Sequence, residues 1–117
     1  MLPEALAAGR GRLAGRPPES TVPCSPVGAA GASSLADMVD KLPPRRAIWM
    51  MVPSGDPVQS TIDQLAPLMS AGDVIIDGGN SNYHDSMRRA DELRAHGIDF
   101  IDAGTSGGIW GLKEGFC

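Results

Sequence analysis

Ser106, Gly107 and Gly108 are the residues of this sequence whose types and spacing first point to chemistry. They follow directly on the apolar, strand-like stretch 98–102. A strand that opens into a Ser-Gly-Gly loop presents backbone N–H groups and one hydroxyl at its carboxyl end, where parallel α/β sheets bind ligands. Because glycine has no side chain, a ligand can approach this backbone closely. The alternative interpretation is a glycine-rich surface loop without a function.

Two further apolar runs also end in small and polar residues. Residues 74–77 lead into Gly-Gly-Asn-Ser at 78–81, and residues 47–52 lead into Pro-Ser-Gly at 53–55. The side chain of Asn80 both donates and accepts hydrogen bonds, so it could bridge hydroxyl groups of two ligands without adding charge. In the alternative interpretation, Asn80 or Ser81 caps a helix, and residues 53–55 form an ordinary turn.

Together, the three segments resemble the N-terminal domain of the 6-phosphogluconate dehydrogenase family, in its shorter bacterial branch. The resemblance rests on Val-Pro-Ser-Gly, Asp-Gly-Gly-Asn-Ser and Gly-Thr-Ser-Gly-Gly-Ile-Trp-Gly-Leu in this order, and it covers residues 28–117. It implies oxidation of 6-phosphogluconate by NADP or NAD, and decarboxylation of the product to ribulose 5-phosphate. It implies cofactor contacts for Val52, Pro53, Ser54 and Asn80, and substrate contacts for Asn80, Ser106, Gly107 and Gly108.

The acid and the base of that reaction are not expected among these residues. By the same resemblance they lie on a long helix beyond Cys117, so no catalytic residue is assigned here. Lys113 and Glu114 are neighbours on a loop, where adjacent side chains point apart, and a solvated charge pair is the favoured interpretation. The resemblance therefore implies a fragment that is inactive by itself, and a homo-oligomer only for the full-length enzyme.

Other interpretations of the site stay open. A 3-hydroxyisobutyrate-type β-hydroxyacid dehydrogenase has similar Ser-Gly-Gly chemistry, although residues 77–81 and 106–112 favour the phosphogluconate branch. Outside the enzymes, the alternative is a non-catalytic remnant or binding fragment. The choice between NADP and NAD depends on a residue that follows the second strand of such folds. That position falls in the atypical N-terminal segment, so the pattern does not decide it.

Composition narrows the possible partners. With 117 residues and 42% hydrophobic residues, the chain has the size and apolar content of one globular domain. A net charge of −4 without a basic stripe argues against nucleic acid. Cys24 and Cys117 form neither a disulfide framework nor a zinc pattern, and no metal site is predicted. No apolar run approaches the roughly 18 residues of a membrane span, so we expect a cytoplasmic protein without membrane contact.

Three strands must position the loops: two are expected to be buried, at residues 47–52 and 74–77, and the third lies at 98–102. Helical patterns separate them, and this alternation is typical of repeated βα units with parallel strands. The predicted fold class is therefore α/β, a Rossmann-like parallel sheet with flanking helices. We expect the fold to be incomplete, because the N-terminal βαβ unit that the resemblance requires is missing or garbled.

The first two predicted helices have recognisable ends. The spacing of the apolar residues from Leu35 to Leu42 predicts one face of a short helix, capped by Ser33 or Ser34. Asp56 is expected to cap the second helix, with Pro57 at its first position. Further along, Pro67 should kink its last turn and Gly72 should close it.

The third predicted helix spans residues 85–96 and ends at Gly97. Its apolar residues Met87, Ala90 and Leu93 are predicted to face inward. Its charged residues are all predicted to face solvent: Arg88, Arg89, Asp91, Glu92 and Arg94.

Residues 1–27 are predicted to form a separate, disordered segment ahead of the domain at 28–117. Half of the ten prolines lie in it, and its composition predicts no strand. An out-of-frame reading of the gene is a second interpretation. Residues 9–14 match the dinucleotide-loop pattern G-x-G-x-x-A. We reject that assignment, because the motif works only between a strand and a helix.

Overall fold

The computed structural model describes residues 5–8, 12–15, 30–106 and 110–115. Within these residues, one sheet has the strand order β3-β2-β1-β4-β5-β6. The strands are β1 (Ala5–Ala8), β2 (Arg12–Gly15), β3 (Ala30–Ala32), β4 (Ala47–Met50), β5 (Val74–Asp77) and β6 (Asp99–Asp102). The helices are α1 (Leu35–Lys41), α2 (Asp56–Leu65), the 3₁₀ turn η2 (Ala66–Leu68), α3 (Tyr83–Arg94) and α4 (Gly111–Glu114).

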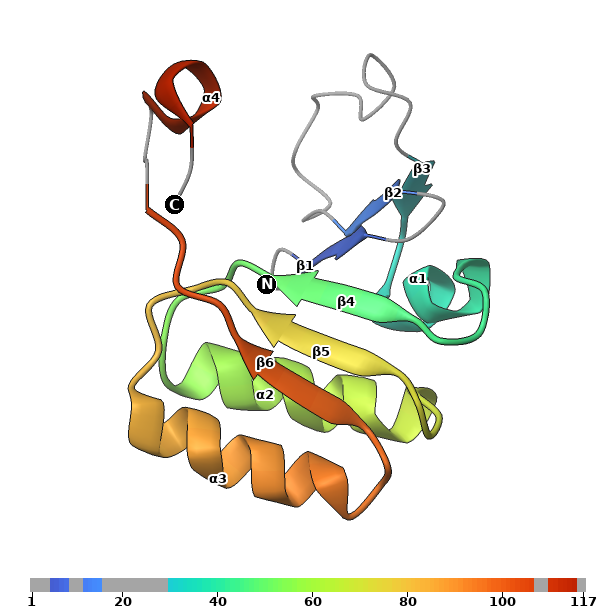
Figure 1. Ribbon diagram of the computed structural model, residues 1–117. Coiled ribbons are helices and arrows are strands. Elements are labelled where there is room, and N and C mark those ends of the chain that lie inside the picture. The colour runs from blue at the N-terminus through green and yellow to red at the C-terminus, as the bar shows by residue number, and fades with distance from the viewer. Residues whose placement is uncertain (1–4, 9–11, 16–29, 107–109, 116–117) are drawn as a thin grey trace.

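The half of the sheet that contains β4, β5 and β6 has the predicted architecture. These strands are parallel neighbours, and the helices α2 and α3 connect them. Figure 1 shows both helices side by side on one face of these strands. The prediction of a Rossmann-like unit built from βα repeats is therefore confirmed for this part of the chain.

The half of the sheet that contains β1 and β2 differs from two predictions: that the N-terminal segment has no strand, and that the strands of the sheet are parallel. Residues 5–8 and 12–15 are strands, so the prediction of an N-terminal segment without a strand is wrong. β1 runs antiparallel to both β2 and β4, so the sheet is mixed. Only residues 9–11 separate β1 from β2, too few for the crossover that a parallel pair needs. β1 also covers the edge of β4, whose backbone groups would otherwise be unpaired. The domain boundary at residue 27 stays a prediction.

The strand assignment of residues 12–15 also bears on the G-x-G-x-x-A match at 9–14. In a dinucleotide loop the last residues of this motif open a helix. Arg12–Gly15 instead form β2, which pairs with β1 and β3. This context agrees with the rejection of the motif.

The ends of α1 and α2 follow the predicted chemistry with two exceptions: the cap of α2 is shifted by one position, and Gly72 does not close this helix, because the 3₁₀ turn after it already ends at Leu68 with Met69 as its cap. Ser34 caps α1, because its Oγ accepts a hydrogen bond from the Asp37 N–H at 3.0 Å. The cap of α2 is Gly55, whose φ is +89°, and Asp56 is the first helical residue. The prediction that Asp56 is the cap is thus off by one position. The α-helix ends at Leu65, and Pro67 lies in the 3₁₀ turn that follows it.

Two side chains of α3 lie opposite to their predicted sides. Met87 is 63% exposed, whereas Arg89 is 1% exposed. The helix has few apolar residues, so its buried side is set by contacts that the Arg89 guanidinium makes with residues of α2 and the turn before it. The predicted outward position of Arg89 and inward position of Met87 are therefore wrong.

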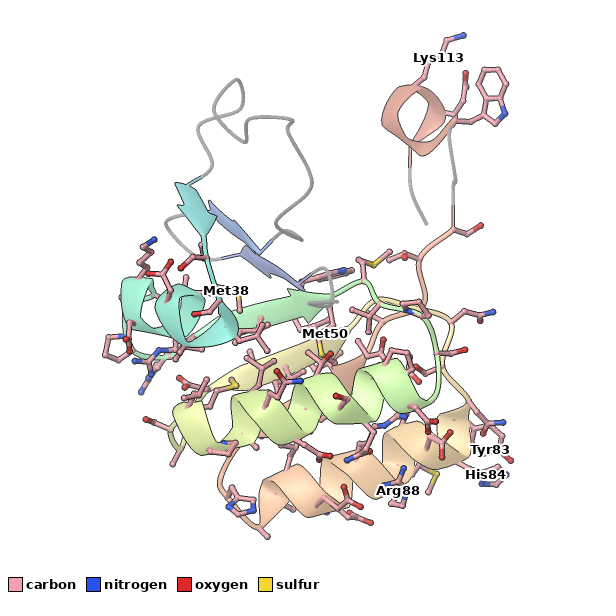
Figure 2. The ribbon with its side chains drawn as sticks, turned by 180° about the vertical axis from the view of Figure 1, so that it is seen from behind. Met38, Met50, Tyr83, His84, Arg88 and Lys113 are labelled. Atoms are coloured by element: carbon pink, nitrogen blue, oxygen red, sulfur yellow. The ribbon has the colours of Figure 1, made fainter. Side chains whose placement is uncertain are left out.

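The core lies between α1, α2, α3 and the sheet. Alternate residues of β4 and β5 point into it, and Met50 of β4 is fully buried beside α2 (Figure 2). The buried apolar residues form one cluster: Leu35, Met38, Val39, Leu42, Ile48, Met50, Val52, Val58, Ile62, Leu65, Ile75, Leu93 and Ile98. This packing holds the carboxyl ends of β4, β5 and β6 in place.

Candidate functional site

The carboxyl ends of β4, β5 and β6 are level with one another. Asp77 of β5 is the register partner of Met50 in β4 and of Asp102 in β6. Just past the strands, the Gly78 N–H donates to the Met50 carbonyl at 2.9 Å, and the Ala103 N–H donates to the Asp77 carbonyl at 2.9 Å. The three loops that carry the predicted site residues therefore begin side by side, at one edge of the sheet.

The loop after β4 joins the core to the first turn of α2. The side chain of Val52 is buried, at 5% exposure, whereas Pro53 and Ser54 are exposed. Gly55 ends the loop with a positive φ that side chains disfavour. Its carbonyl accepts hydrogen bonds from two N–H groups in the first turn of α2. The backbone around Ser54 is thus fixed at both ends, while its hydroxyl faces solvent.

The loop after β5 folds back on the carboxylate of Asp77. One oxygen, Oδ1, accepts from the Gly79 N–H at 3.0 Å, and the other, Oδ2, accepts from the Ser81 hydroxyl. Asp77 is fully buried, so both bonds lie in an environment where an unpaired oxygen would be costly. The sequence motif alone does not predict a role for Asp77. The structure shows that its carboxylate shapes the loop that presents Asn80.

Asn80 lies at the tip of this loop and is exposed. The Asn80 side chain makes no hydrogen bond within the described part of the chain. The hydroxyl of the neighbouring Ser81 donates to Asp77 instead. The cap of α3 is Asn82, whose Oδ1 accepts from the His84 N–H at 2.9 Å. The alternative in which Asn80 or Ser81 caps the helix is therefore wrong, and the Asn80 amide is free to meet a ligand.

Gly78 and Gly79 permit close packing at the base of the loop. A Cβ on Gly78 would lie 2.3 Å from Trp49 Nε1 and 2.7 Å from Met51 Sδ. A Cβ on Gly79 would lie 3.0 Å from the carbonyl oxygen of Val52. The two loops therefore touch through backbone, which brings Asn80 near the Val52–Ser54 segment.

The loop after β6 is tied to the same point. The Thr105 hydroxyl donates to the Gly78 carbonyl at 3.1 Å, and Ser106 follows it as an exposed residue. Gly107 and Gly108 lie outside the described residues. Thr105 was part of the motif but received no role from the sequence, because its partner is 27 residues away. The structure thus brings Val52, Pro53, Ser54, Asn80 and Ser106 to one edge of the sheet.

Comparison with known proteins decides which family has this arrangement. A family model described as the NAD binding domain of 6-phosphogluconate dehydrogenase matches residues 12–117. The chain belongs to this family. The match begins at Arg12, ahead of Gly28, the residue at which the resemblance was expected to begin.

Curated relatives carry the name 6-phosphogluconate dehydrogenase, decarboxylating. The protein from Ceratitis capitata is 54% identical over 85 residues, which is 73% of this chain and 18% of that protein. The NAD(+)-dependent protein from Haloferax volcanii is 44% identical over 98 residues, which is 84% of this chain and 32% of that protein. The chain thus spans between 18% and 32% of the length of these two relatives.

A solved structure supports the fold of the family. A protein from Mycobacterium avium 104, provisionally assigned as an oxidoreductase, superposes with a TM-score of 0.67 at 27% identity. The superposition covers 79% of this chain and 32% of the other. The Rossmann-like assignment therefore rests on both the strand topology and this likeness.

Lys113 and Glu114 lie apart from the hydrogen-bonded loops of this NAD-binding domain. Their side chains are 78% and 65% exposed, and Lys113 Nζ lies 3.6 Å from Glu114 Oε1. Figure 2 shows Lys113 pointing away from the sheet on the short helix α4. The interpretation as a solvated charge pair is confirmed, but the prediction that the two residues lie on a loop with their side chains pointing apart is wrong, because both belong to α4 and their charged groups are paired. Among the described residues, no group of histidine, cysteine or acidic side chains could hold a metal ion, and no helix is long and apolar enough to span a membrane.

Proposed function

We propose that the carboxyl edge of β4, β5 and β6 binds a nicotinamide dinucleotide together with 6-phosphogluconate. The activity would be the NAD(P)-dependent oxidative decarboxylation of this sugar acid to ribulose 5-phosphate. The observation that carries the proposal is the free, exposed amide of Asn80, on a loop whose Gly79 packs against the Val52 carbonyl and whose Gly78 carbonyl accepts a hydrogen bond from Thr105. Family membership and the names of the relatives support the choice of ligands.

The residues of the edge suit the binding of such ligands. Asn80 offers a donor and an acceptor, and Ser54 and Ser106 offer hydroxyls. Gly79, which precedes Asn80, approaches the Val52 carbonyl so closely that a Cβ would lie 3.0 Å from its oxygen. In this proposal Val52, Pro53 and Ser54 contact the dinucleotide and Asn80 contacts both ligands. Ser106, with Gly107 and Gly108, holds the carboxylate and hydroxyls of the sugar acid.

The contribution of these residues to the reaction is orientation. When bound, the dinucleotide accepts a hydride from the sugar acid, and this transfer requires that the two reacting carbons be held close together. A side chain that bonds both ligands fixes their relative position directly. Asn80 does so without adding charge, so it binds the ligands and leaves proton transfer to other groups.

A binding titration tests the site. The 117-residue chain is titrated with NADH, NADPH and 6-phosphogluconate by calorimetry, together with the variant Asn80→Ala. Gln64→Ala is the matched control, since it removes an exposed amide that bonds only to Ser60 of the same helix. We expect saturable dinucleotide binding that Asn80→Ala weakens and Gln64→Ala does not. No binding, or equal binding by both variants, would contradict the proposal.

We further propose that the 117 residues bind these ligands without turning them over. Lys113 and Glu114 are adjacent, exposed and paired with each other, so neither is held at the reacting atoms. A positioned acid or base typically contributes about 10²–10⁴-fold to the rate. The test is an absorbance assay of the chain with 6-phosphogluconate and either oxidised dinucleotide. Turnover at a rate normal for enzymes would show that this part of the proposal is wrong.

A further inference from the structure

Arg89 of α3 is a buried cation outside the predicted site. It is 1% exposed, although it lies on a helix whose sequence is mostly polar and charged. Its Nη2 donates to the Gly55 carbonyl at 3.1 Å, and its Nε donates to Gln59 Oε1 at 3.2 Å. Both partners belong to the start of α2. The guanidinium thus joins α3 to the residue that ends the loop at Val52–Gly55.

The Gly55 carbonyl that Arg89 contacts accepts more than one hydrogen bond. The Gly55 oxygen also accepts from the N–H groups of Val58, at 3.2 Å, and Gln59, at 3.3 Å. Gly55 itself has a positive φ, a backbone conformation that residues with a side chain rarely adopt. A change in the Arg89 contact would therefore act on the loop and on the first turn of α2 together.

Packing alone does not account for an arginine here. Burial of a guanidinium is costly unless its donors are paired, and Nη1 of Arg89 is buried without a hydrogen-bond partner in the described part of the chain. An apolar side chain of similar length would fill the same space without this cost. What the guanidinium adds is a directional, two-point attachment to Gly55 and Gln59.

We propose that Arg89 is a positioning residue for the dinucleotide site. It fixes the loop at Val52–Gly55 relative to α3, and α3 begins directly after the loop that presents Asn80. The distance between the two ligand-contacting loops is then set at their base by Gly79 and at the helix by Arg89. This inference rests on the proposed function, because it assigns the loop at Val52–Gly55 to the dinucleotide.

The test compares two neighbouring arginines. Arg89→Met removes the buried attachment and keeps the apolar stem. Arg88→Met is the matched control, because Arg88 also reaches Gln59 Oε1, at 3.3 Å, but is 48% exposed and otherwise pairs with Glu92 and Asp85 on its own helix. Hydrogen exchange at the Val58 and Gln59 amides and the dissociation constant for NADH are measured for both variants and for the wild type.

We expect exchange at Val58 and Gln59 to be about tenfold faster or more in Arg89→Met, the factor that one hydrogen bond to a charged donor represents. NADH binding should weaken roughly two- to tenfold. Arg88→Met should change neither. If Arg89→Met does not fold, Arg89→Lys serves instead, since lysine keeps the charge but lacks the two-point geometry.

Each outcome decides between the two proposals. If the variant is less stable to heat but binds NADH as the wild type does at a temperature where both are folded, Arg89 is only structural and the inference is wrong. Equal exchange in both variants also overturns it. A wild-type chain that binds no dinucleotide overturns the proposed function, and with it the role of Arg89 at a dinucleotide site.

Discussion

Asp77 holds the hydroxyl of Ser81 across the turn that connects β5 to α3. The carboxylate is fully buried and takes its second hydrogen bond from the Gly79 N–H, at 3.0 Å. The backbone between Asp77 and Ser81 is thus wrapped around one carboxylate, and Asn80 in this segment is exposed.

Removal of the Ser81 hydroxyl should destabilise the domain. Ser81→Ala leaves one oxygen of a buried carboxylate without its partner, which typically costs about 1–3 kcal/mol. Ser60→Ala is the control, because the Ser60 hydroxyl is exposed on α2 and bonds only Gln64. Its expected effect lies within about 0.5 kcal/mol of zero. Urea unfolding measures both, and equal free energies of unfolding would show that the Asp77–Ser81 bond does not stabilise the turn.

An alanine at Gly78 should displace the indole of Trp49. The new Cβ would lie 2.3 Å from Trp49 Nε1 and 2.5 Å from Cε2, so the ring must move. Overpacking of this kind costs about 1–3 kcal/mol. Gly104→Ala is the control, since nothing lies within 4 Å of its Cβ. In a Trp110→Phe background, which leaves Trp49 as the emitter, only Gly78→Ala should shift the fluorescence maximum. An unshifted spectrum with unchanged stability would contradict the packing.

The strands β4 and β5 could be predicted from the sequence, because buried parallel strands read as continuous apolar runs. Residues 74–77 are β5 as predicted, and the predicted strands at 47–52 and 98–102 contain β4 and β6. The burial of Arg89 could not be predicted. Its partners are a backbone carbonyl and an amide 34 and 30 residues away, and neither is marked by a hydrophobic pattern.

The same limit applies to the details of the site. Asp77 accepts a hydrogen bond from the Ser81 hydroxyl, Asn82 accepts one from the His84 N–H, and the Thr105 hydroxyl donates to the Gly78 carbonyl. These contacts depend on how the loops fold after β5 and β6 end, which no sequence pattern indicates. The strands of the N-terminal segment were missed for another reason. β1 pairs with β4 through its backbone, and its sequence of alanine and leucine has no period that distinguishes a strand.

Stability should fall in acid because of Asp73, at the edge of the sheet opposite to the site. Burial raises the pKa of this carboxyl, but the N–H groups of Ser70 and Arg46 and the Arg46 guanidinium outweigh burial and hold the pKa below its usual value of 3.8. The unfolded chain then binds more protons, so stability rises with pH. The contribution is complete above about pH 4 and is lost as pH falls through the pKa of the folded state.

Asp73→Asn should flatten this acid dependence and lower the stability at pH 7. The amide keeps one acceptor but loses the charge that pairs with Arg46, at 3.2 Å. A smaller slope remains from the partly exposed Asp37, whose pKa is lowered by hydrogen bonds from Lys41 and Ser33. Asp40→Asn, at an exposed position of α1, is the control. The free energy of unfolding is measured with urea between about pH 2.5 and 7, a range that brackets the usual pKa of an aspartate. Parallel curves for Asp73→Asn and the wild type would contradict the assignment.

Asn80 and Ser106 should differ in which ligand they affect. If Asn80 bridges the two ligands, Asn80→Ala weakens the binding of both dinucleotide and 6-phosphogluconate. Ser106→Ala should weaken the binding of the sugar acid alone, because Ser106 lies on the loop that follows β6, which Thr105 joins to the base of the Asn80 loop. Loss of one neutral hydrogen bond costs about 0.5–1.5 kcal/mol, which is roughly a 2- to 13-fold change in affinity. Calorimetric titrations with each ligand alone measure the four constants. Near-wild-type constants in both variants would place the ligand site on other loops of the domain.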